Sequence, residues 1–258
     1  MALTNKTIAS TYGDILQVDN SGSGRTASGT AIKDGLGQST ALTLGQNKLH
    51  VKPASDQTDA VVIETSGGTD LLTVDTTNSA IKVGTTQSYA NTQVQRFGVF
   101  DTGAVAGTHY PMFLDQMIGG GGTSYSTAMG TGTDPSDSYT ISSGADILTP
   151  CYWYIPSAIT IDEVRVLGGG EAADNINFHL KSFTLATGTG SGAGDLSSGA
   201  LLAHNGSSLV VGADRITSTT LTIDSANVAA DKVVLAFFEN TDSTTDLTAQ
   251  LIVKYHYQ

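Results

Sequence analysis

The sequence predicts an all-β protein, in which an N-terminal extended segment and a short intertwined β shaft precede a C-terminal, jelly-roll-like β-sandwich. Charged residues make up only 14% of the 258-residue chain, which also holds 30 glycines, a composition that suits short strands joined by tight turns. Apolar and polar residues alternate over many short stretches, and no stretch has the period of a long amphipathic helix. Tyr12 is the only aromatic residue before Tyr89, so the first third cannot build an aromatic core.

The chain changes character near Tyr89. Before this residue there are 6 basic and 8 acidic residues, and from it onward there are 6 and 16. We therefore expect modules under different constraints. These are an extended segment over residues 1–40, a β-repeat shaft over 41–88, a transition region with a Gly/Ser/Thr-rich loop over 89–148, and the sandwich over 149–258.

The expected shaft consists of short segments with a period of about two, joined by Gly, Asn, Ser and Thr residues that favour turns. The segments are 41–44, 48–51, 60–64, 70–75 and 80–84. A ribbon of this kind has little apolar surface to bury by itself and leaves two open edges. We therefore expect a homo-oligomer, most simply a trimer, whose copies supply the missing core. The alternative is a curled sheet that the second module of the same chain covers.

Strand patterns are strongest after Thr149. They cover 151–155, 159–167, 176–181, 215–223, 232–238 and 246–257, and six such segments with turns between them are typical of a β-sandwich. For the earlier apolar stretch 110–118, a short helix is one interpretation. We expect Trp153 to point into the core with Cys151 and Ile155, because strand alternation places these three on one side. The alternative is a sugar-stacking platform formed by the two flanking tyrosines.

The last two strand segments define the expected core. The final strand alternates between an apolar face, which includes Leu251 and Val253, and a mostly polar face. The segment 233–238 has no polar residue, so we expect it to be central and buried on both faces. Pairing of these two strands would set Val233, Leu235 and Phe237 against the opposite sheet together with Leu251 and Val253.

Composition and motifs exclude several function classes. A net charge of −12 disfavours binding to nucleic acid and to anionic lipid. The longest strongly apolar run is too short to span a bilayer, and the N-terminus lacks the apolar core of a secretory signal. We therefore expect a protein made in the cytoplasm, not exported by a cleavable signal and not inserted in a membrane. The single cysteine, Cys151, excludes an intrachain disulfide and is expected to be a buried small hydrophobe.

No motif points to catalysis. The sequence has no Gly-x-Ser-x-Gly elbow and no phosphate-binding Gly-Lys-Ser or Gly-Lys-Thr, and the glycine-rich stretch 188–194 lies between strands and is interpreted as a hairpin loop. The five histidines are scattered without metal-binding spacing. The acidic run 239–246 reads as a turn, with calcium a weak alternative. We therefore expect no enzyme activity, no catalytic residue, no metal site and no cofactor.

Five stretches carry a family resemblance. Residues 7–20, Thr-Ile-Ala-Ser-Thr-Tyr-Gly-Asp-Ile-Leu-Gln-Val-Asp-Asn, followed by Ile-Lys-Asp-Gly-Leu-Gly at 32–37, resemble the opening of small structural proteins of marine tailed phages. Residues 70–85 resemble the shaft element that precedes the distal domain of phage tail fibres. Tyr-Ile-Pro-Ser-Ala-Ile-Thr-Ile-Asp-Glu-Val at 154–164 and the ending Val-Lys-Tyr-His-Tyr-Gln are similar to the terminal sandwich of the same group.

The resemblance implies a location in the virion, with a virion-anchoring segment over residues 1–40, a short trimeric shaft and a distal head. The apolar residues of the anchor would be Ile8, Tyr12, Ile15, Leu16 and Val18. The chain would then be a fibre or spike subunit that contacts other virion proteins of the tail or capsid and mediates adsorption to a host surface receptor. The receptor-binding residues are not singled out, although the Gly/Ser/Thr loops are the expected place.

Two other functions stay open at this point. The first is a capsid decoration or cement protein, a head fibre that stabilises the shell without touching a receptor; the short length of the chain leaves room for it. The second is a polysaccharide depolymerase, which would need a pair of catalytic carboxylates. No convincing pair emerges from the sequence, which disfavours this enzyme.

Overall fold

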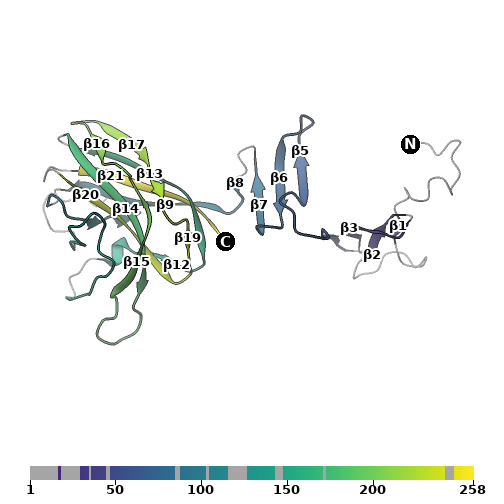
Figure 1. Cartoon of the computed structure of the whole chain (residues 1–258), viewed down its shortest axis with the longest axis horizontal. Helices are drawn as coiled ribbons and strands as arrows, with labels where there is room; N and C mark the ends of the chain where they lie inside the picture. The colour runs from purple at the N-terminus through teal and green to yellow at the C-terminus, as the bar shows by residue number, and fades with distance from the viewer. Residues whose placement is uncertain are drawn as a thin grey trace. The chain divides into compact units, whose positions relative to one another are not determined.

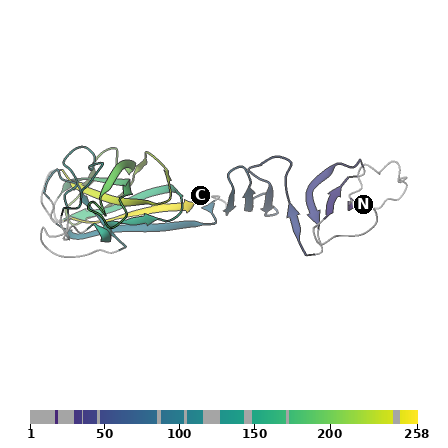
Figure 2. The same cartoon turned by 90° about the horizontal axis from the view of Figure 1, so that it is seen from below.

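A computed structural model describes residues 17–18, 30–34, 36–44, 47–84, 88–102, 105–115, 127–142, 148–170, 173–241 and 247–258. The chain forms two compact units, Met1–Ala90 and Asn91–Gln258, each built from antiparallel strands (Figures 1 and 2). Within the described residues there is no α-helix, and the one helical turn is the 3-10 turn η2, Thr149–Cys151. The all-β prediction is therefore confirmed.

The first unit contains two small meanders in which consecutive strands pair. The first consists of β1 (Gln17–Val18), β2 (Thr30–Lys33), β3 (Ser39–Leu44) and β4 (Leu49–Val51). The second consists of β5 (Val61–Glu64), β6 (Asp70–Asp75), β7 (Ala80–Val83) and β8 (Ser88–Tyr89). Each of the five segments expected between residues 41 and 84 forms a strand at its place. The period-two pattern located them because each strand has one face more apolar than the other.

The second unit is a sandwich of two antiparallel sheets (Figure 1). The seven-stranded sheet contains β10 (Tyr110–Pro111), β20 (Lys232–Asn240), β14 (Asp174–Leu185), β15 (Leu196–His204) and β18 (Thr222–Ile223), with β12 (Trp153–Ile155) on β20 and β16 (Leu209–Val211) on β14. The six-stranded sheet contains β11 (Phe113–Leu114), β9 (Thr92–Thr102), β21 (Leu247–Tyr257), β13 (Ile159–Gly170) and β17 (Ile216–Thr220), with β19 (Asn227–Val228) on β13.

The sandwich begins well before residue 149, where the sequence placed its boundary. Strand β9 pairs with β21 from Thr92 to Thr102 and lies inside the six-stranded sheet. The stretch 110–118 is also not a short helix where it is described, because β10 and β11 each add two residues to a sheet. Pro111 fits there because β10 is an edge strand, where a residue without an N–H group does not interrupt the sheet.

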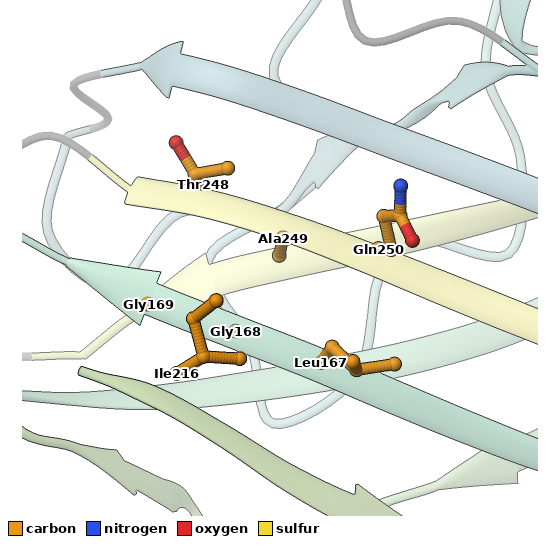
Figure 3. A pocket seen from close by; sticks show the side chains of 7 residues that line it. All are labelled: Leu167, Gly168, Gly169, Ile216, Thr248, Ala249 and Gln250. Carbon is orange, nitrogen blue, oxygen red and sulfur yellow. The ribbon is translucent and has the colours of Figure 1, made fainter.

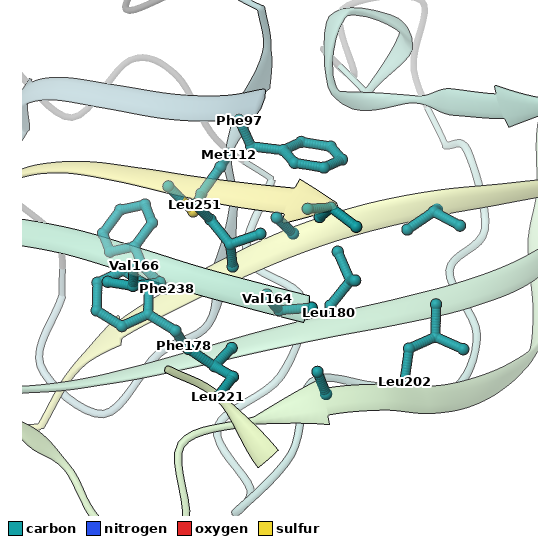
Figure 4. Close-up of a cluster of buried hydrophobic side chains, with 14 of the residues drawn as sticks. Phe97, Met112, Val164, Val166, Phe178, Leu180, Leu202, Leu221, Phe238 and Leu251 are labelled. Carbon is teal, nitrogen blue, oxygen red and sulfur yellow. The ribbon is translucent and has the colours of Figure 1, made fainter. Parts of the chain in front are cut away.

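The main core lies between the two sheets (Figure 4). Phe178 and Leu180 of one sheet and Val164, Val166 and Leu251 of the other are all fully buried in it. The expected pairing of β20 with β21 is wrong, because the two strands lie in opposite sheets, and β20 instead pairs with β10, β12 and β14. Two apolar strands can meet face to face as well as edge to edge, and the hydrophobic pattern does not distinguish these arrangements.

Strand β20 is buried on both faces, as its sequence predicted. Val234, Ala236 and Phe238 join the main core, whereas Val233, Leu235 and Phe237 belong to a second apolar cluster. The expected set of five core residues is therefore buried but divided between two clusters. The second cluster lies on the outer face of the seven-stranded sheet, where Met129, Leu148 and other residues from outside the strands cover it.

The prediction that Cys151, Trp153 and Ile155 lie on one side is right for Trp153 and Ile155 but wrong for Cys151, because Cys151 belongs to the 3-10 turn η2 and strand alternation does not apply to it. Trp153 and Ile155 are buried in the main core and Cys151 in the second cluster, while Tyr154 is 48% exposed. The Trp153 ring packs at 4.8 Å from the ring of Tyr255 and at 6.3 Å from that of Phe97. Burial raises the pKa of the Cys151 thiol to about 12, so this cysteine is a packed apolar group and not a reactive thiolate.

Candidate functional site

One face of the ribbon β5–β8 is entirely aliphatic over three strands. The register pairs Val61 with Val74, Ile63 with Leu72, Leu72 with Val83 and Val74 with Ile81, and directly paired residues share a face of the sheet. We call these six residues the aliphatic face. Ile63 is 54% exposed, Ile81 51% and Val83 40%. Large apolar side chains gathered on one surface in this way are typical of an interaction site.

The opposite face, called the polar face below, carries charged side chains of the ribbon together with the exposed Val62 and Leu71. The Asp75 carboxylate accepts hydrogen bonds from the Asn78 backbone and side chain at 2.9 and 2.8 Å and from Lys82 Nζ at 2.8 Å. These bonds, those of Asn78 first, lower the pKa of Asp75 to about 2. The bond with Asp75 raises the pKa of Lys82. The two faces of the ribbon therefore differ: Asp75 and Lys82 form an ion pair on one face, and the six residues of the other face are all aliphatic.

A small cavity lies on the outer face of the six-stranded sheet, where β13, β17 and β21 meet (Figure 3). Its volume is about 260 Å³, and it is lined by Leu167, Gly168, Gly169, Ile216, Thr248, Ala249 and Gln250. Gly169 is required at this point, because a Cβ atom would lie 2.8 Å from the Arg215 carbonyl oxygen. The lining contains no acid, base or thiol nucleophile, so the cavity can hold a small apolar group but supplies no catalytic machinery.

Three histidines that are far apart in the sequence lie in one row on the seven-stranded sheet. The rings of His109 and His179 are 4.9 Å apart in a T-shaped contact, and those of His179 and His204 are stacked at 6.3 Å. His109 is fully buried and His179 is 4% exposed. Across the described ranges, no group of three or more His, Cys, Asp or Glu side chains has a geometry that would hold a metal ion.

Sequence spacing did not predict this row. His179 in β14 is paired with His204 in β15. In the sequence, however, residues 109, 179 and 204 show no recurring spacing. One usable signal was the alternation Phe178, His179, Leu180, Lys181, which places two polar residues on the outer face of a strand. That pattern is normally read as a solvent-facing side, whereas His179 and Lys181 are both buried here.

The five residues predicted to anchor the chain lie mostly outside the described residues. Ile8, Tyr12, Ile15 and Leu16 precede the first described strand. Val18 lies in β1 and is paired with Ile32 of β2. The anchor therefore stays a prediction. The glycine-rich stretch 188–194 connects the antiparallel strands β14 and β15, as expected of a hairpin loop.

In the part of the chain that is described, no helix is long and apolar enough to cross a membrane. No protein-family model matches the sequence, and no curated protein matches it. Among solved structures, the chain is similar to one from the infectious bursal disease virus Gx strain, with 8% sequence identity and a TM-score of 0.29. The match covers 83% of this chain and 38% of that one.

Proposed function

We propose that this chain is a structural subunit of a tailed-phage particle, a fibre or spike that works as a homotrimer and mediates adsorption to the host surface. The aliphatic face of β5–β7 carries the proposal, because a ribbon with such a face needs partners. The resemblance of residues 7–20, 32–37, 70–85 and 154–164 to phage structural proteins supports the class. The division into a thin ribbon unit and a separate sandwich unit suits a fibre with a distal head.

The partner that best fits the aliphatic face is another copy of the same face. It carries six aliphatic side chains and no charge, so it is self-complementary, and three copies around an axis would cover all of them. Each square ångström of apolar surface removed from water stabilises the assembly by roughly 25 cal/mol. The polar face, with its paired Asp75 and Lys82, would then point outward into solvent.

Charge also favours contact through the ribbon. The residues before Tyr89 carry 6 basic and 8 acidic side chains, whereas those from Tyr89 onward carry 6 and 16. Identical copies of the ribbon therefore repel one another only weakly, while identical sandwiches carry most of the negative charge. Assembly through the ribbon keeps the acidic sandwiches free to project from the particle.

Sedimentation equilibrium of the full chain tests the oligomer. We expect three times the chain mass of 26.5 kDa for the wild type. Ile81→Asp places a charge on the aliphatic face and should give a monomer, because a carboxylate buried between copies without a partner is strongly unfavourable. Leu71→Asp is the matched control, since Leu71 is 50% exposed and lies on the other face. A wild-type monomer, or dissociation by Leu71→Asp alone, would overturn the proposed trimer.

Location on the particle tests the function. Gold-labelled antibody against the sandwich should label the tail end of intact particles in electron micrographs, and the free antibody should slow adsorption to host cells. Labelling spread over the capsid, with adsorption unchanged, would instead identify a decoration protein. The absence of label from purified particles would reject a virion role altogether.

A further inference from the structure

Residues 127–142 form a strap over the outer face of the seven-stranded sheet. At its first end, the backbone N–H of His109 donates to the Gly130 carbonyl and that of Met129 donates to the His109 carbonyl, both at 2.9 Å. Met129 is 1% exposed within the second apolar cluster, and Tyr139 and Ile141 pack against the same cluster. The strap therefore covers the apolar outer side of β20, including Phe237.

The other end of the strap is fixed by backbone pairing. Tyr139 and Leu196 exchange two backbone hydrogen bonds at 2.9 and 2.8 Å, and the Gly199 N–H donates to the Asp137 carbonyl at 2.8 Å. A Cβ atom on Gly199 would lie 2.7 Å from the Asp137 Cα atom. Glycine at this position is what permits the strap to lie so close to β15.

Between these ends, the strap is held by three basic side chains of the sheet region. His109 Nε2 lies 2.8 Å from the Gly132 carbonyl oxygen, and the Thr133 carbonyl accepts a hydrogen bond from His179. Lys181 Nζ donates to the Pro135 carbonyl and to an Asp137 carboxylate oxygen, both at 2.6 Å. Because carbonyl oxygens only accept, each histidine keeps its proton on Nε2 and leaves Nδ1 as the unprotonated nitrogen.

Both Nδ1 atoms are buried and have no hydrogen-bond partner. A second proton on either ring would create a buried N–H donor with no acceptor, in addition to a buried positive charge. The closed strap therefore accommodates only the neutral ring of His179. Lifting the strap would break the bonds of both rings to the Gly132 and Thr133 carbonyls and so free the rings.

The charged groups that face the row do not remove this constraint. Glu239 Oε2 lies 3.9 Å from His109 Nε2 and already accepts from Asn177. Asp134 Oδ1 lies 3.4 Å from His179 Nε2, but its side chain is 52% exposed, so solvent screens its charge. Both carboxylates approach the nitrogens that are already protonated. Asp137 is 77% exposed and paired with Lys181, whose cation repels any imidazolium formed nearby.

His204 lies at the end of the row, beside a carboxylate. Its Nδ1 lies 2.7 Å from Asp224 Oδ2, and both side chains are about one third exposed, at 32% and 30%. Its ring is stacked on that of His179. A positive charge there disfavours a second one on the neighbouring ring.

We propose that His179 acts as an acid-sensitive latch, so that its proton uptake below neutral pH releases the strap and uncovers the apolar outer face of the seven-stranded sheet. Burial, followed by the neighbouring His109, His204 and Lys181, lowers the pKa of His179 to about 3. An imidazole exposed by strap opening would instead return to its ordinary pKa near 6.5. Acid therefore favours the open strap.

The single cysteine provides the test. Cys151 is 1% exposed in the second cluster beneath the strap, so its reaction with 4,4′-dithiodipyridine reports strap opening, and Trp153 emission reports the main core. We define protection as the labelling rate of the chain unfolded in guanidinium divided by that of the native full chain at the same pH. From pH 7.5 to pH 5.0 we expect protection to fall about 30-fold, the factor for one histidine that becomes free to titrate, with Trp153 emission unchanged.

His179→Gln keeps a side-chain donor for the Thr133 carbonyl but cannot take up a proton, so its acid sensitivity should be at least about tenfold smaller. His50→Gln is the matched control, because His50 is an exposed histidine of the other unit, and it should behave as the wild type. Hydrogen exchange of the wild-type Tyr139 and Gly199 amides, compared with amides between β13 and β21, measures the same opening without a variant. Wild-type protection that does not change between these pH values, equal acid sensitivity of His179→Gln, or a simultaneous change in Trp153 emission would overturn the latch.

Discussion

Replacement of Phe237 by alanine should strongly destabilise the sandwich. The side chain is fully buried and packs against Phe183 with ring centroids 6.2 Å apart. Its removal loses the transfer free energy of the ring and leaves a cavity, which together cost about 3 to 5 kcal/mol at a well-packed site. A domain of this size loses about 2 to 4 °C of melting temperature per kcal/mol. We therefore expect a decrease on the order of 6 to 20 °C.

Lys254→Ala is the control for this experiment. Lys254 lies on the outer face of β21 and is partly exposed, so its truncation should change stability by no more than about 0.5 kcal/mol. Thermal melts followed by Trp153 emission compare the two variants. Equal decreases would show that the outer side of β20 is not packed as described. A decrease below about 1 kcal/mol for Phe237→Ala would mean that the strap collapses into the cavity.

Three further predictions concern other parts of the chain. Removal of residues 1–24 should leave the melt of the sandwich unchanged but prevent incorporation into particles, which occupancy on purified particles measures. Gly199→Ala should cost about 1 to 3 kcal/mol because its Cβ meets the strap backbone, whereas Gly206→Ala, where nothing lies within 4 Å, should cost far less in a denaturant titration. The pKa of Asp75 is lowered to about 2 from 3.8, so its contribution to stability is present above pH 3.8 and is lost as the pH falls through 2. In a ¹³C-aspartate-labelled chain, the carboxyl signal of Asp75 should remain that of a carboxylate at pH 3. In the Asn78→Ala variant, the same carboxyl should already take up protons at this pH.

The strands of the ribbon could be located from the sequence because local information is sufficient for them. Each strand is short, alternates with period two and is followed by turn residues, and each pairs with the next strand along the chain. The Asp75 to Lys82 contact has the same origin, since the two residues flank one hairpin. The sequence likewise placed Trp153 and Ile155 inside, because one tryptophan among apolar neighbours has a clear preference for the core.

Tertiary structure alone decided which strands become neighbours. Periodicity identifies the apolar face of a strand but not the partner to which its backbone bonds, so β20 and β21 were expected side by side and instead face each other across the core. The sequence did not predict that β9 belongs to the sandwich, because its partner strand β21 is far away along the chain.

The histidine row is the clearest case in which the sequence is silent. His109, His179 and His204 come from three separate segments and meet only because β14 pairs with β15 and the chain before β10 lies beside them. The alternating pattern of β14 determined that His179 and Lys181 point away from the main core. The strap then determined that this outward side is buried, because a loop is placed by long-range contacts such as those of Tyr139 with Leu196, which leave no periodic trace in the sequence.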